Sequence, residues 1–369
     1  MGAPLLTLRR IHVSGTPAEM GRAHGEELRS TIRAFVDQRL AALRQYMAER
    51  GDDRVDEFLR VGASCFDVAR RWDPEGTAEH VGIAEGAGVD ASELYAVANM
   101  TDVRDVLLLP PSNQDEGCTS FMLPARLSAS GTVVAGQTWD LNPDDLDFVV
   151  AVHRRPSEGP ETWSVTCAGC LSLVGMNEWG VSVGTTNIKV RSTRIGVGYM
   201  SLLHRALQER SRQASCDVLL AAPRAAAHTY WIADAEGALE IEATALDAVV
   251  RQLDNSPGNL AGGGPLVRAN HCLAPSIAAL QGEPTTASSR ARQQRAQELL
   301  ERGPHDLESL RRLLADRSDG VDSINRYPED EQGTTTNSCV LAWPAERRLW
   351  ACRGPADRGE WVELPFAGR

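Results

Sequence analysis

Gln114-Asp115-Glu116-Gly117-Cys118-Thr119-Ser120-Phe121 (QDEGCTSF) is the stretch of this 369-residue chain on which both fold and function depend. A polar segment precedes Cys118, and small hydroxyl residues follow it. Glycine reaches backbone conformations that other residues avoid, so Gly117 can hold a distorted peptide bond ready for attack. Cys118 is therefore either a core cysteine at the start of a strand or a nucleophile that becomes a new chain terminus.

The second interpretation has a definite chemistry. The Cys118 thiol attacks the Gly117 carbonyl, the acyl group moves from nitrogen to sulfur, and water releases it. Cys118 is then left with a free α-amino group beside its own thiol. The ordinary pKa of an α-amine is about 7.7–8.0, which lies close to working pH. Such an amine can act as the base that activates the nucleophile.

The patterns on the two sides of this stretch differ. Helical spacing dominates the first third, beginning with the capping box Thr16-Pro17-Ala18-Glu19 and continuing through helices expected at Arg54–Trp72 and Asp90–Arg104. Gly82–Gly88 is expected to be a short helix or turn with close packing.

After Cys118 the apolar residues alternate with a period of two, which is typical of strands. Strands are expected at Cys118–Pro124, Thr132–Trp139, Trp163–Ala168, Leu171–Met176, Val181–Thr186, His228–Ala233, Leu239–Thr244, Ala248–Leu253, Leu266–Asn270, Ser338–Trp343, Leu349–Arg353 and Trp361–Leu364. Helices are expected at Tyr199–Arg210, Cys216–Ala222, Ser288–Arg302 and Asp306–Asp316. This order favours an α+β sandwich of one domain over a doubly wound parallel sheet.

Three further residues are candidates for a site with Cys118. Asp140 ends the second strand of the first expected hairpin, which brings it near the start of the first strand, where it can hold a proton or a substrate amine. The amide of Asn270 can donate to an oxyanion, but its neighbour His271 can instead form a Cys–His pair with Cys118. Arg326 can hold a carboxylate with two hydrogen bonds.

Other classes of site and partner are less well supported. Cys167 and Cys170 form a lone CxxC between expected strands, so we interpret them as packing cysteines, and no residue spacing indicates a metal site. The net charge is −12 with no basic run, which argues against nucleic acid. We expect no membrane span, no signal peptide, a cytoplasmic location and reduced thiols for all 8 cysteines.

Six short motifs occur in one order along the chain, and in that order they resemble the acyl-coenzyme A:isopenicillin N (6-aminopenicillanic acid) acyltransferase family of N-terminal-nucleophile hydrolases. They are Gly15–Gly25, Ile83–Val89, Asp115–Ser120, Gly136–Asp140, Asn270–Leu273 and Ser323–Arg326. The family often has Asp-Gly-Cys-Thr-Thr and Ile-Cys-Arg, where this chain has Glu116, Ser120 and Asn325.

The resemblance implies a four-layer αββα sandwich with two antiparallel sheets between helical layers. It also implies self-cleavage at Gly117–Cys118 into chains 1–117 and 118–369, which stay associated. By position, it implies that Cys118 is the nucleophile, that Asp140 lies near it, that Asn270 stabilises the oxyanion and that Arg326 helps to hold the site.

The leading hypothesis is therefore an acyl-transfer enzyme that forms or hydrolyses a small-molecule amide through an acyl-cysteine. Its partners are an acyl donor and an amine acceptor or water, with no cofactor beyond an acyl-CoA or another acyl thioester as co-substrate. One alternative is a Cys118–His271 protease or amidase that does not cleave itself. Another is a ligand-binding protein that keeps the fold without catalysis.

Overall fold

The computed structural model describes residues 5–108, 117–255, 263–282, 284–331 and 333–367. The helices are α1 (Pro17–Glu27), α2 (Arg29–Ala48), α3 (Val55–Trp72), α4 (Pro74–Ala87), α5 (Ala91–Ala98), α6 (Met100–Val106), α7 (Tyr199–Ala206), α8 (Arg212–Ala221), α9 (Pro275–Ala278), α10 (Ala287–Leu300) and α11 (Leu307–Leu314).

Within these residues the strands form two sheets. The eight-stranded sheet has the order β1 (Arg9–Gly15), β4 (Val149–Pro156), β5 (Thr162–Cys167), β6 (Val174–Asn177), β7 (Ser182–Asn187), β8 (His228–Asp234), β9 (Gly237–Ala243) and β10 (Ala248–Gln252). The six-stranded sheet has the order β11 (Leu266–Arg268), β2 (Gly117–Leu123), β3 (Val134–Leu141), β12 (Thr335–Trp343), β13 (Arg348–Arg353) and β14 (Val362–Glu363).

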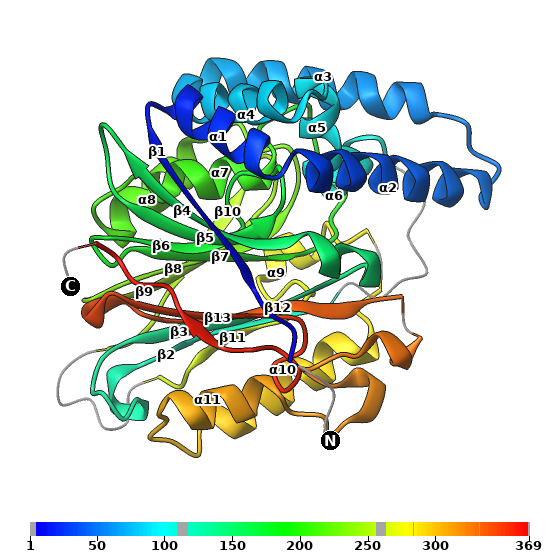
Figure 1. Cartoon of the computed structure of the whole chain (residues 1–369). Coiled ribbons are helices and arrows are strands. Elements are labelled where there is room, and N and C mark those ends of the chain that lie inside the picture. Colours follow the sequence, from blue (N-terminus) through cyan, green and yellow to red (C-terminus); the bar gives the residue numbers. More distant parts are fainter. Residues whose placement is uncertain (1–4, 109–116, 256–262, 283, 332, 368–369) are drawn as a thin grey trace.

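The two sheets lie face to face between helical layers, as Figure 1 shows. Helices α1–α8 cover the eight-stranded sheet, and α10 and α11 cover the six-stranded sheet on the opposite side (Figure 1). The fold is therefore the expected α+β sandwich with αββα layers. Both faces of β2 and β3 are covered, and every residue of β2 is buried. A side chain at the start of β2 therefore lies inside the protein, away from bulk water.

One pair of strands departs from the antiparallel pattern. β1 pairs with β4 in parallel along its whole length, from Arg9 opposite Val150 to Gly15 opposite Pro156. Neither strand was predicted, because residues 9–15 begin with two adjacent arginines and their partner lies far along the chain. β1 precedes Cys118 and β4 follows it, so this pairing joins the two halves of the chain.

The glycine-rich segment at 82–88 is also more regular than expected, since residues 82–87 lie in the helix α4 and Gly88 is its left-handed C-cap. A Cβ atom at Gly21 of α1 would lie 2.0 Å from the Glu79 carbonyl oxygen, and one at Gly82 would lie 2.5 Å from the Ala18 carbonyl oxygen. The glycines therefore allow α1 and α4 to pack backbone against backbone. The predicted capping box of α1 is confirmed, with Thr16 and Glu19 bonded reciprocally.

Candidate active site

Cys118 lies at the start of β2, where strand pairing fixes its neighbours. Gly117 is opposite Asp140 on β3, and Cys118 is opposite Trp139. The hairpin register thus brings Asp140 beside the peptide bond between Gly117 and Cys118. Cys118 is 6% exposed, so its reactive atoms lie in a small and shielded space.

Asn270 reaches the same point from the turn after β11. Its Oδ1 accepts a hydrogen bond of 2.8 Å from the backbone N–H of Cys118. Its Nδ2 donates to the carbonyl oxygen of Asn187 at 3.0 Å, which leaves the second hydrogen of the amide for another acceptor. The backbone N–H of Asn270 donates to Ser289 Oγ at 2.9 Å, which ties the turn to α10.

His271 faces a different partner. Its Nδ1 lies 2.7 Å from Ser289 Oγ, and burial is the main cause that lowers its pKa below the usual value. It is absent from the residues that line the pocket at Cys118. Of the two neighbours, the structure places Asn270 rather than His271 in that pocket.

Arg326 packs directly against Gly117. A Cβ atom at Gly117 would lie 2.8 Å from the Arg326 Cζ atom, so a side chain there would require the guanidinium to move. Gly117 lacks the side chain that would collide with the Arg326 guanidinium. Arg326 is held by Thr334, whose Oγ1 accepts from Nη1 at 2.6 Å, and by a bond to Ser288 Oγ.

Asp140 is almost completely buried, with 1% of its surface exposed, and burial raises its pKa to about 6. The positive charges of Arg326 and Arg292 oppose that rise without cancelling it. Neither carboxylate oxygen has a hydrogen bond of normal geometry among the described residues. A carboxyl group in this state can gain or lose a proton near neutral pH.

Arg292 of α10 also lies at the site, although no motif in the sequence pointed to it. It is fully buried and its Nη1 donates to the Cys118 carbonyl oxygen and, at 3.1 Å, to Thr119 Oγ1. Its Nη2 donates to Asn270 Oδ1 at 3.0 Å. One guanidinium therefore fixes both the backbone of Cys118 and the amide that holds its nitrogen.

A buried ion pair supports the turn that carries Asn270. Arg268 donates to Glu242, and Glu242 also accepts the backbone N–H groups of Leu273 and Ala274 at 3.1–3.2 Å. The two ends of the turn are thereby fastened to β9. Asn270 is positioned by this framework and by α10 together.

The sequence model of the family described as acyl-coenzyme A:6-aminopenicillanic acid acyl-transferase matches residues 127–357, more than half of the chain. The chain belongs to this acyltransferase family. The match includes Asp140, Asn270 and Arg326 and begins shortly after Cys118. A search of curated protein sequences found no match.

Several solved structures are similar at low identity. A Caenorhabditis elegans N-acylethanolamine-hydrolyzing acid amidase ortholog shares 14% identity, with a TM-score of 0.46, over 67% of this chain and 100% of that chain. A conjugated bile acid hydrolase variant from Clostridium perfringens shares 13% identity, with a TM-score of 0.47, over 67% and 92%. Penicillin V acylase from Agrobacterium tumefaciens shares 12% identity, with a TM-score of 0.40, over 68% and 87%. The family assignment rests on the sequence match.

In this member of the acyltransferase family, a small pocket of about 30 Å³ opens beside Cys118. It lies between the sheets and is lined by Thr101, Cys118, Trp139, Asp140, Leu141, Leu173, Thr185, Asn187, Tyr199, His228 and Asn270. The space suffices for the reacting atoms of a substrate and little more.

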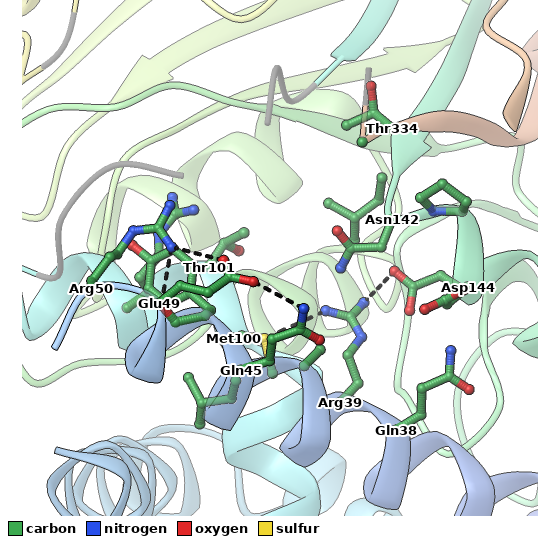
Figure 2. Close-up of a pocket in the computed structure, with 18 residues that line it drawn as sticks. Gln38, Arg39, Gln45, Glu49, Arg50, Met100, Thr101, Asn142, Asp144 and Thr334 are labelled. Atoms are coloured by element: carbon green, nitrogen blue, oxygen red, sulfur yellow. Dashed lines mark hydrogen bonds and ion pairs between the residues drawn. The ribbon is translucent and has the colours of Figure 1, made fainter. Parts of the chain in front are cut away.

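A larger pocket of about 450 Å³ adjoins it, since Thr101 and Leu141 line both. It lies among α2, α6 and the 3-10 turn at Pro143–Phe148 (Figure 2). Arg39 in Figure 2 donates to Asp145 at 2.8 Å, and both side chains are under 10% exposed. The volume lies in the range of about 300–1,000 Å³ that small-molecule sites occupy.

The described residues were also searched for disulfides, metal ligands and membrane-spanning helices. Cys167 and Cys170 are buried and form no disulfide, and the same holds for the other cysteines. No group of three or more His, Cys, Asp or Glu side chains in the described part of the chain is arranged to hold a metal ion. Nor is any helix in that part of the chain long and apolar enough to cross a membrane. Asp115 and Glu116 lie outside the described residues.

Proposed function

We propose that the protein is a cysteine-dependent acyl-transfer enzyme that activates itself by breaking its own Gly117–Cys118 bond. The observation that carries the proposal is the hydrogen bond of 2.8 Å from the Cys118 N–H to Asn270 Oδ1, at a pocket that Asp140 also lines. The nitrogen that becomes the α-amine is thus already held before the bond breaks.

The activation step uses groups that surround Gly117. The Cys118 Sγ atom attacks the Gly117 carbonyl carbon, the C–S bond forms, and the C–N bond breaks as the nitrogen takes up a proton. Asp140, opposite Gly117, can carry that proton because its pKa is about 6. The Arg326 charge favours negative charge on the Gly117 oxygen. Water then hydrolyses the thioester and frees the Cys118 thiol.

Turnover uses the new terminus. The α-amine takes the thiol proton, and Sγ attacks the carbonyl of an amide or thioester. The remaining Nδ2 hydrogen of Asn270 stabilises the oxyanion. The departing amine or thiol takes the proton from the α-amine, which leaves an acyl-cysteine for water or an acceptor amine to attack.

The proposed substrates are small N-acyl amides, or acyl thioesters with an amine acceptor. The family description names acyl-coenzyme A and 6-aminopenicillanic acid, and we carry over only the chemical class. The pocket of about 450 Å³ next to Cys118 offers space for the rest of the substrate. No cofactor is required by these steps.

We also propose that chains 1–117 and 118–369 remain together after cleavage. β1 and β4 pair over seven residue positions across this division. The buried pair Arg154–Glu79, at 2.6 Å between Nε and Oε1, crosses it as well. The alternative Cys118–His271 pair has less support, because His271 is bonded to Ser289 and does not line the pocket.

The test is intact mass spectrometry of the wild-type protein and the Cys118→Ala variant, before and after incubation with a panel of acyl amides and thioesters. We expect the wild-type C-terminal chain to gain the mass of one acyl group and the variant to gain none. Absence of any adduct or product across the panel would support a ligand-binding protein without catalysis. Turnover by the alanine variant would refute the proposal.

A further inference from the structure

His228 lines the pocket beside Cys118 and is paired with a buried aspartate behind it. His228 begins β8, and its Nε2 lies 2.6 Å from Oδ1 of Asp102 on α6. Both residues are 2% exposed. Cys118 and Asp140 belong to the six-stranded sheet, whereas His228 and Thr185 belong to the eight-stranded sheet. Cys118 and His228 therefore line one small pocket, each from a different sheet.

The hydrogen bonds determine which nitrogen of the ring can act. A carboxylate only accepts, so the bond to Asp102 places the proton of a neutral imidazole on Nε2. Asp102 is itself held, because its Oδ2 accepts the Tyr199 N–H at 2.9 Å, and the Tyr199 ring stacks on the imidazole at 4.7 Å between centroids. The tautomer and the ring plane are both fixed.

The other nitrogen has a weak contact. Within the described residues its neighbour is Thr185 Oγ1 at 3.4 Å, and that hydroxyl donates its hydrogen to the Thr229 carbonyl oxygen at 3.0 Å. Nδ1 therefore keeps a lone pair for a proton. An imidazole with a carboxylate on one nitrogen and a reactant on the other is the usual arrangement of a general base.

We propose that His228, oriented by Asp102, accepts the proton of the water or amine that attacks the acyl-cysteine. This inference rests on the proposed function. As the acceptor's O–C or N–C bond forms and the S–C bond breaks, the acceptor's proton passes to Nδ1 of His228. The Cys118 sulfur leaves as a thiolate and is reprotonated when the imidazolium gives up that proton. The α-amine of Cys118 serves the first half of the reaction and His228 the second.

The assignment also links the two chains. Asp102 precedes the cleavage point and His228 follows it, so the pair exists only while both chains are assembled. Neither residue had a sequence signal, because they lie 126 positions apart and meet only through the packing of α6 on the eight-stranded sheet.

The test compares the wild-type protein with His228→Gln in a stopped-flow assay with p-nitrophenyl acetate as acyl donor and hydroxylamine as added acceptor. A glutamine amide can reach Asp102 as Nε2 does, but it offers no base at the Nδ1 position. We expect the initial burst of p-nitrophenol to be kept and the discharge of the acetyl-cysteine to slow by about a hundredfold. Acetylated chain then accumulates and is seen by mass spectrometry.

Discharge at the wild-type rate would overturn the inference and leave the proposed function standing. Equal slowing of burst and discharge would also overturn it, since that is the result of a merely structural role. A wild-type protein that is acylated neither by p-nitrophenyl acetate nor by any acyl amide or thioester of the panel defeats the proposed function and the inference with it. If His228→Gln does not fold, Asp102→Asn decides between the same outcomes, because it keeps the shape of the pair but weakens the base.

Discussion

Arg326 and Asp140 face each other at 3.9 Å between Nε and Oδ2, with side chains that are 1% and 0% exposed. This separation is too long for a hydrogen bond, so the arginine attracts the carboxylate without fully offsetting the cost of burying its charge. Asp140 consequently keeps a pKa of about 6 beside two arginines. That spacing makes Asp140 suitable for proton transfer at Gly117.

The raised pKa of Asp140 should make the stability of the protein depend on pH. The folded-state pKa of Asp140 is about 6, compared with an ordinary value of 3.8. Between these values the folded state binds more protons than the unfolded state, so stability should fall as pH rises from about 4 to about 6. The full contribution is on the order of 3 kcal/mol. Urea unfolding of wild type and Asp140→Asn across this range should show a shallower pH dependence for the variant. Parallel curves would contradict the assignment.

The two proposed functions of Asn270, one in self-cleavage and one in turnover, can be separated. Asn270→Asp keeps an oxygen that accepts from the Cys118 nitrogen but loses the hydrogen proposed for the oxyanion. We expect turnover to fall by about 10²–10³-fold, while self-cleavage continues. Asn270→Ala loses both contacts and should impair cleavage as well. Gel analysis of cleavage beside steady-state kinetics would measure both effects. Unchanged kcat in the aspartate variant would exclude the oxyanion role.

Replacement of Arg292 should disturb the site through Cys118 and Asn270. A lysine has one point of contact and cannot serve the Cys118 carbonyl and Asn270 together. We expect Arg292→Lys to lower the free energy of unfolding by about 1–3 kcal/mol and to slow turnover. Arg290, which is exposed on the same helix, is the matched control, and Arg290→Lys should change neither quantity. Equal behaviour of the two variants would show that the buried contacts are unimportant.

Gly117→Ala should slow self-cleavage without unfolding the protein. Its new methyl group would meet the Arg326 guanidinium, which must move away from the bond to be broken. The folded chain should therefore accumulate uncut, as a gel time course would show. Shortening Arg326 in the same protein (Gly117→Ala with Arg326→Lys) should relieve the overlap but not restore cleavage. Normal cleavage in the single variant would show that the close contact is not needed.

Short-range patterns in the sequence predicted much of the frame of the site. A hairpin between 118 and 139 follows from alternating residues and a short turn, and it brings Asp140 beside Gly117. The turn after Leu266–Arg268 likewise follows from the end of a strand pattern. These features depend on neighbours along the chain, which a sequence shows directly.

Arg292 could not be predicted in the same way. Residues 287–300 carry several arginines at helical spacing, and only packing against a strand 174 positions away makes Arg292 the buried one. His228 was predicted only as the first residue of a strand, because its partner Asp102 lies 126 positions away in the sequence. The parallel pairing of β1 with β4 also depends on a distant partner. Contacts of this kind are fixed by the tertiary fold.

The most direct test of the central claim is N-terminal sequencing of the purified, active protein, together with its intact mass. We predict two chains of about 13 and 27 kDa from the 40.0 kDa polypeptide, the larger beginning Cys-Thr-Ser-Phe. Fully active protein that remains one uncut polypeptide would contradict the account.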